Sequence, residues 1–151
     1  MAAEPVAGAR GAGALNLFDA LPEGEWHRRF SSELGAELWG GSLYELAPGQ
    51  QSPYHWQVGE EEWLLVLAGA LTLRTPEGEE VLRPWDLVAF PRGETGAHQV
   101  RNETSEPVRL FFFSTLSDPE VVVYPDDDRV KVVGGWRDGK ESVRGFLERS
   151  G

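Results

Sequence analysis

The sequence contains no cysteine and no long run of apolar residues, and each absence excludes a class of protein. Without cysteine there is no disulfide framework, no thiolate zinc site and no cysteine nucleophile. Any bound metal must therefore use nitrogen and oxygen ligands. No stretch reaches the roughly 18 apolar residues that a membrane span needs, and the N-terminus lacks the layout of a signal peptide. We therefore expect a cytoplasmic protein.

Positive charge is also scarce. The 151 residues carry 14 lysines and arginines against 25 aspartates and glutamates, which gives a formal net charge of -11. A polyanion such as DNA, or an anionic bilayer, would be repelled by this charge. We therefore expect neither a nucleic-acid nor a membrane partner. A chain of this length is the usual size of one domain and is long enough to bury a core of its own.

The distribution of turn residues predicts an all-β domain. Residues 1–14 are small and almost without large apolar side chains, which is typical of a flexible tail. The rest, 15–151, is predicted to be a single domain, because from Leu34 onward short apolar or alternating runs are separated by Gly, Pro and Asp turns, as in a β-sandwich or barrel. One short C-terminal helix is predicted over 142–150, where apolar residues recur at helical spacing, namely Val143, Phe146 and Leu147.

The segment SPYHWQVGEEEW, from Ser52 to Trp63, concentrates residues that can bind a metal ion. On a strand, His55 and Gln57 point to the same face because residues two apart do so. Glu62 opens the next strand after a turn, and His98 lies on a separate strand further along the chain. These four side chains could converge. Glu60 and Glu61 are expected in the solvated turn, although a rotated turn would let either replace Glu62.

The spacing of these residues resembles the two motifs of the cupin superfamily. In the first motif Gly49, His55, Glu62 and Gly69 stand at the family positions, with Gln57 where a second histidine is usual. In the second motif Pro91, Gly93, His98 and Asn102 match, but Trp85 replaces the first glycine and two extra residues separate Gly93 from His98. The resemblance covers about residues 42–115. It implies a jelly-roll β-barrel whose metal ligands would be His55, Gln57, Glu62 and His98.

The ligand types favour particular metals. Two imidazoles and one carboxylate are the set that non-haem Fe(II) oxygenases use, and an amide oxygen is a weak, hard donor. We therefore expect one divalent ion, iron or manganese first and nickel or zinc next. The alternative is that Gln57 has converted the metal site into a metal-free pocket, with Gln57 hydrogen-bonded to a ligand or to Glu62.

The aromatic residues suggest a pocket and a partner. Tyr54, Phe90 and Phe112 are expected to line a mostly apolar substrate cavity. The strand 63–73 is apolar on both sides, so it is either a central strand or a subunit interface, and with Trp39 and Trp136 it favours a homodimer. His27 is expected to be structural, and the run Asp126–Asp128 is expected to be solvated. Arg101 and Arg109 are not assigned to substrate.

Two functions follow from the resemblance. The first is a small-molecule metalloenzyme with dioxygenase-like or isomerase-like chemistry. The second is a non-catalytic cupin that binds or senses a small ligand with a weakened or absent metal site. A fold alone does not choose between them.

Overall fold

The structure is a computed structural model and describes residues 13–31, 33–135 and 143–148. Over these residues the chain forms strands and two short 3-10 turns, and the predicted all-β class is confirmed. The elements are β1 (His27–Arg29), β2 (Trp39–Leu46), β3 (Trp56–Gln57), β4 (Glu62–Ala68), β5 (Leu71–Thr75), β6 (Gly78–Leu82), β7 (Leu87–Phe90), η1 (Glu94–Gly96), β8 (Gln99–Arg101), β9 (Val108–Thr115), β10 (Glu120–Tyr124), η2 (Pro125–Asp127), β11 (Arg129–Gly134) and β12 (Val143–Glu148).

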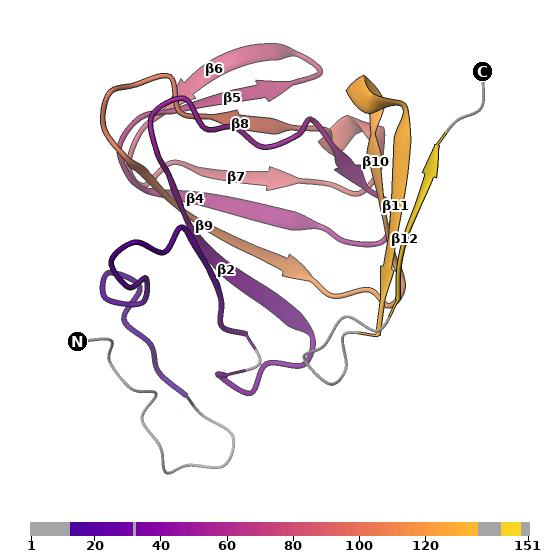
Figure 1. The fold of residues 1–151 in the computed structure, drawn as a ribbon, viewed down its shortest axis with the longest axis horizontal. Coiled ribbons are helices and arrows are strands. Elements are labelled where there is room, and N and C mark those ends of the chain that lie inside the picture. The colour runs from indigo at the N-terminus through magenta and orange to yellow at the C-terminus, as the bar shows by residue number, and fades with distance from the viewer. Residues whose placement is uncertain (1–12, 32, 136–142, 149–151) are drawn as a thin grey trace.

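The strands assemble into sheets that enclose the core of a jelly roll (Figure 1). The main sheet has the order β1-β2-β9-β4-β7, and the small sheet has the order β6-β5-β8. The end sheet, with the order β12-β11-β10-β3, stands across one end of the other two in Figure 1. All the strand pairs are antiparallel, as expected when short turns connect neighbouring strands.

The apolar run after Glu62 forms two strands, which belong to different sheets. β4 lies between β9 and β7 in the main sheet, so it is a central strand, and Leu64 and Val66 are fully buried on its inner face. The chain then turns at Gly69 and continues as β5 in the small sheet. Between the two sheets lies the main core, built from residues that alternate along the strands: Leu46, Leu64, Val66, Leu71, Leu73, Leu82, Phe90, Val100, Val108 and Leu110.

The outer face of the main sheet is partly covered by the N-terminal segment. Leu21 and Phe30 are buried there against Leu43, together with partly buried side chains that include Leu15 and Phe111. The predicted tail, 1–14, lies outside the described residues except for its last two positions. Within the described chain, no helix has the length and apolar character needed to cross a bilayer.

The predicted C-terminal helix is wrong. Residues 143–148 form β12, which pairs with β11 in the register Val130 with Leu147 and Val132 with Gly145. An apolar segment this short is compatible with either periodicity, and Gly145 weakens a helix by about 1 kcal/mol relative to alanine. The exposed edge of β11 offers a complete ladder of backbone hydrogen bonds, which an isolated helical turn cannot match.

At two turn positions that correspond to glycines of the motifs, the backbone has a positive φ angle. At Gly69 the φ angle is +82° and an added Cβ would lie 2.8 Å from the carbonyl oxygen of Pro107, so a side chain is excluded. Trp85 occupies the place of a motif glycine and has a φ angle of +75°, in the left-handed region. A residue other than glycine is strained in that region, and the indole of Trp85 is 74% exposed, so packing does little to offset the strain.

Candidate metal centre and cavity

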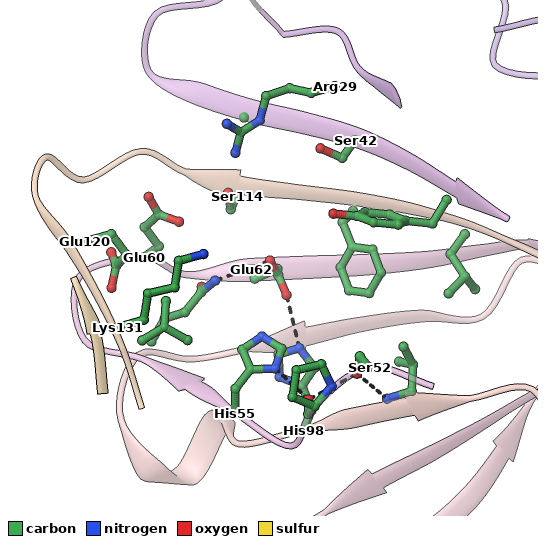
Figure 2. A pocket seen from close by; sticks show the side chains of 18 of the residues that line it. Arg29, Ser42, Ser52, His55, Glu60, Glu62, His98, Ser114, Glu120 and Lys131 are labelled. Carbon is green, nitrogen blue, oxygen red and sulfur yellow. Dashed lines mark hydrogen bonds and ion pairs between the residues drawn. The ribbon is translucent and has the colours of Figure 1, made fainter. Parts of the chain in front are cut away.

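Three of the predicted ligands meet at one point. His55 and His98 face each other in an isolated antiparallel bridge between the loop before β3 and the start of β8, with backbone N–H···O distances of 3.0 and 2.9 Å. Glu62, the first residue of β4, approaches from the main sheet (Figure 2). One potential ligand atom from each of the three side chains lies within 4.8 Å of the other two. The predicted convergence of these three side chains is therefore present, and their role as metal ligands stays a prediction.

Both imidazoles are oriented by backbone carbonyls. The Nδ1 atom of His55 lies 3.0 Å from the oxygen of Pro53, and the Nδ1 atom of His98 lies 2.9 Å from the oxygen of Gly96. A carbonyl oxygen only accepts, so each Nδ1 carries the proton and each Nε2 presents a lone pair in the neutral ring. This arrangement is usual for histidines that ligate metals. The two residues inserted before His98 lie in η1, and the turn supplies the Gly96 carbonyl.

The contact between His98 and Glu62 brings two acceptor atoms together. Nε2 of His98 lies 3.1 Å from Oε1 of Glu62, although both atoms are acceptors when the ring is neutral and protonated on Nδ1. A shared proton or a cation between the two atoms offsets their repulsion. Metal–ligand bonds of about 2.1 Å at right angles would separate two neighbouring ligand atoms by about 3.0 Å. The observed spacing therefore fits a bound divalent ion.

His55 is suited to act as a neutral donor. Burial lowers its pKa, and the neighbouring His98 lowers it further, against smaller effects of Glu62 and the Pro53 carbonyl that raise it. The positive charge of Lys131 adds the smallest of the lowering effects. A lower pKa keeps the imidazole unprotonated at neutral pH, so Nε2 does not have to lose a proton before it binds a cation.

Gln57 lies beside the three ligands rather than among them. Its Nε2 atom lies 3.5 Å from Oε2 of Glu62, the carboxylate oxygen that does not contact His98. The opposite amide orientation would bring two acceptor oxygens together, so the nitrogen faces Glu62. In this structure Gln57 therefore helps to orient the carboxylate, as in the predicted alternative in which it bonds to Glu62. Its role as a direct ligand stays a prediction.

Only one of the three aromatic residues predicted to line the pocket does so. Phe112 lines the cavity beneath the metal centre, whereas Phe90 and Tyr54 do not. Phe90 is buried behind His98 and stacks on its ring at a centroid distance of 3.6 Å, so it fixes the imidazole from outside the cavity. Tyr54 neighbours His55 in the chain and points the other way, under the guanidinium of Arg74 at 4.0 Å.

Two further carboxylates lie near the three ligands. Glu60, expected in the solvated turn, lines the cavity instead, and one of its oxygens accepts a 3.1 Å hydrogen bond from the Ser117 amide. Burial raises the pKa of Glu60 to about 7, and the negative charges of Glu120 and Glu62 contribute to the rise. Glu61, by contrast, is exposed, with one oxygen 3.5 Å from the indole nitrogen of Trp63.

Glu120 is almost fully buried, with 3% of its surface exposed. Its Oε1 atom accepts hydrogen bonds from the backbone amides of Val58, Gly59 and Val121 at 2.9–3.0 Å. Its Oε2 atom is buried without a hydrogen-bond partner among the described residues.

These side chains surround a cavity of about 360 Å³, within the range of small-molecule sites. The metal centre lies on its wall. One part of the lining is apolar and comes from the barrel core, and the other part is polar and charged. The polar and charged lining comprises Arg29, Ser42, Tyr44, Gln51, Ser52, His55, Gln57, Glu60, Glu62, His98, Ser114, Glu120, Tyr124 and Lys131.

Sequence reasoning missed several members of this lining. Arg29 enters from β1, opposite Ser42 of β2, whereas Glu120, Tyr124 and Lys131 enter from the end sheet. The alternation of residues along each strand shows which of them share a face. It does not show that the C-terminal strands fold across the end of the barrel, so no local signal could identify this group.

The remaining charged residues singled out in the sequence lie elsewhere. The ring of His27 stacks on Tyr44 at 4.4 Å, consistent with a structural role. Arg101 pairs with Glu79 and Glu103, and Arg109 pairs with Glu45, all outside the cavity. The run Asp126–Asp128 is exposed as expected, although Asp126 also forms a two-bond ion pair with Arg74.

Comparisons with known proteins agree with this architecture. Residues 42–114 match the family model of the cupin domain. A sugar phosphate isomerase of the cupin superfamily from Silicibacter pomeroyi is 28% identical with a TM-score of 0.74, over 82% of this chain and 75% of that one. No curated protein matches the sequence.

Two further solved structures share the fold at lower identity. A candidate sugar phosphate isomerase from Acidithiobacillus ferrooxidans is 24% identical with a TM-score of 0.69, over 91% of this chain and 78% of that one. The polyketide cyclase RemF from Streptomyces resistomycificus is 23% identical with a TM-score of 0.54, over 60% of this chain and 64% of that one. The matched motifs, the jelly roll and the shared structures together identify this chain as a small cupin-domain protein.

Proposed function

We propose that the protein is a metal-dependent enzyme that isomerises a small hydroxylated carbonyl compound. The observation that carries the proposal is the pair His98 and Glu62, whose acceptor atoms lie 3.1 Å apart at the wall of a 360 Å³ cavity. His55, Glu62 and His98 would hold the ion, with Gln57 supporting Glu62. Iron or manganese suits this donor set best. The similarity to a sugar phosphate isomerase supports the type of reaction.

The cavity contains the groups that such a reaction needs. A divalent ion bound by the three ligands would polarise a carbonyl oxygen of the substrate. Glu60 lies in the cavity outside the ligand group, and unlike Glu120 it is not held by three backbone amides, so we assign it to proton transfer. The apolar wall around Phe112 and Leu110 excludes water from one side of the substrate.

The proton transfers balance without any other reactant. The C–H bond beside the carbonyl breaks, its proton moves to the Glu60 carboxylate, its electron pair forms a C=C bond, and the carbonyl π pair moves onto the oxygen to give an enediolate. The proton of the adjacent hydroxyl then moves to that oxygen, the C–O bond it leaves becomes the new carbonyl, and the C=C electron pair takes back the proton from Glu60 at the former carbonyl carbon. One carbon is oxidised and its neighbour is reduced, so no external oxidant is required.

Metal content is the first test. Protein purified without chelator should contain about one equivalent of iron or manganese by elemental analysis. His98→Ala should contain less than a tenth of an equivalent, whereas the matched control His27→Ala, which removes a histidine outside the cavity, should retain the ion. Equal metal content in all three proteins, or none in any, contradicts the assignment.

The reaction type is tested on the metal-loaded protein. An isomerase of this kind should incorporate deuterium from D₂O at the carbon beside the carbonyl of its substrate, and Glu60→Gln should abolish the incorporation without loss of metal. Consumption of dioxygen with the same substrates would instead favour an oxygenase. Tight binding with neither activity would favour a non-catalytic binding cupin, for which the glutamine at position 57 is the specific argument.

A further inference from the structure

The cavity-facing side chains of the main sheet change from polar to apolar with distance from the metal centre. On β9 they are Ser114, Phe112 and Leu110, because residues two apart on a strand share a face. The strand register pairs Glu62 with Ser114, at the polar end. On the neighbouring β2, Leu46 extends the apolar end beyond Leu110. A ligand whose oxygen atoms are held at the metal centre therefore has an apolar wall beside the rest of its length.

Three aromatic rings belong to this apolar wall. The ring of Trp26, just before β1, lies 6.0 Å from that of Tyr44, and Tyr44 meets Phe112 edge-on at 5.6 Å and 86°. All three residues line the cavity, and Trp26 is also 60% exposed, so it stands where the cavity opens to solvent. His27 stacks on Tyr44 and lies 5.5 Å from Trp26, and it supports both rings from outside the cavity.

The apolar wall has few partners for a hydroxyl group. Besides the rings it contains core residues, namely Leu46, Val100 and Leu110. The hydroxyl of Ser52 already accepts a hydrogen bond from the Val100 amide and donates one to the Pro53 carbonyl. A ligand hydroxyl placed here would give up its hydrogen bonds to water without replacement, which is unfavourable. The part of a ligand that lies on this side is therefore expected to carry no hydroxyl groups.

We infer that the substrate carries a planar aromatic ring beside its hydroxycarbonyl group, and that Trp26, Tyr44 and Phe112 bind this ring. Aromatic rings attract one another in edge-on and offset arrangements at about 4.5–7 Å, the range in which these three already lie. The inference rests on the proposed function and names the part of the substrate that does not react. It also gives Trp26, which precedes the matched region 42–114, a role in specificity.

The test compares ligands with and without the ring. Three probes are titrated by calorimetry into protein as purified and after chelator treatment: 2-hydroxyacetophenone, hydroxyacetone, which has a methyl group in place of the ring, and glucose 6-phosphate. The aromatic ketone should bind about tenfold more tightly than the other two or better, because its ring buries more apolar surface. Equal binding of the two ketones, or no binding of either at millimolar concentration, would overturn the inference. Equally tight binding of glucose 6-phosphate would assign the wall to a sugar and overturn it too.

Matched tryptophan variants locate the ring. Trp26→Ala should weaken binding of 2-hydroxyacetophenone about fivefold or more, and Trp26→Phe should restore most of the loss. Trp85→Ala, which removes an indole that is 74% exposed and lies outside the cavity, should bind as the parent does. If Trp26→Ala binds as Trp85→Ala does, the ring site is wrong.

Saturation-transfer NMR distinguishes ring contact from a general effect on the fold. In the parent, the ring protons of 2-hydroxyacetophenone should receive more saturation from the protein than its methylene protons, and Trp26→Ala should remove this difference. A uniform loss over both groups of protons would show that Trp26 only maintains the shape of the cavity, which contradicts the inference.

Failure of the proposed function leaves a different signature. In that case 2-hydroxyacetophenone would still bind in a manner that depends on Trp26, but the protein would hold no metal and would exchange no deuterium into the probe. If the ring inference alone fails, metal-loaded protein would exchange deuterium into hydroxyacetone as fast as into 2-hydroxyacetophenone, and Trp26→Ala would leave the two rates unchanged.

Discussion

Trp85 offers a quantitative test of the backbone geometry at the second motif. Its φ angle of +75° costs a residue other than glycine about 1–2 kcal/mol. Glycine avoids this cost but loses about 0.5–1 kcal/mol of additional backbone entropy on folding. Trp85→Gly and Trp85→Ala both remove the indole, so its contacts cancel in the comparison. The glycine variant should therefore be more stable by about 0.5–1 kcal/mol.

The assay is thermal and urea unfolding of the two variants. For a chain of this size the difference corresponds to about 2 °C in Tm. Val81 in β6 is the matched control, because it is 69% exposed and is not among the residues with positive φ. There the order should reverse, with Val81→Ala more stable than Val81→Gly by about 0.5–1 kcal/mol. A Trp85→Ala variant as stable as Trp85→Gly or more so would refute the left-handed geometry.

Three further predictions concern pH, packing and assembly. The pKa of Glu60 is raised to about 7, above the 4.5 of an unperturbed carboxyl group, so its contribution to stability is present below pH 4.5 and is lost as the pH rises through 7. In chelator-treated protein the Glu60→Gln variant should therefore be more stable than the parent by about 1 kcal/mol at pH 8, after allowance for solvent screening. At pH 5 the two proteins should be nearly equal in stability. A larger gain in stability at pH 5 than at pH 8 would contradict the direction of the pKa shift. Gly69→Ala should cost about 2 kcal/mol in urea unfolding and more than Gly49→Ala, because only Gly69 combines a positive φ with a 2.8 Å approach to a carbonyl oxygen. We also propose a homodimer that forms through the apolar groove on the outer face of the main sheet, where Trp39 is 48% exposed. Sedimentation equilibrium should then show a dimer for the parent and a monomer for Trp39→Lys. A parent protein that is monomeric at micromolar concentration would exclude this dimer.

The ligand group could be predicted because each member is fixed by local rules. Strand periodicity places His55 on one face, and the turn that follows brings Glu62 onto the next strand. The motif spacing adds His98. The structure brings these three side chains together as predicted. The place of Gln57 could not be derived in the same way, because ligand and neighbour positions differ only by the rotation of a side chain.

The polar half of the cavity depends on long-range packing. Glu60 is one residue from the exposed Glu61, and no hydropathy pattern distinguishes the two. Arg29 and Lys131 are about a hundred residues apart, and they share a cavity only because β1 joins the main sheet while β11 belongs to the end sheet. The mistaken helix at 143–148 has the same origin, since the partner strand β11 decides its conformation and a short apolar pattern does not.

Binding of one divalent ion by His55, Glu62 and His98 can be seen directly in a crystal structure of protein loaded with Mn²⁺, with anomalous data collected at the manganese edge. We expect one strong peak within about 2.0–2.3 Å of Nε2 of both histidines and of a Glu62 carboxylate oxygen. Absence of a peak at this position, or a peak held by the exposed acidic run Asp126–Asp128 instead, would contradict it.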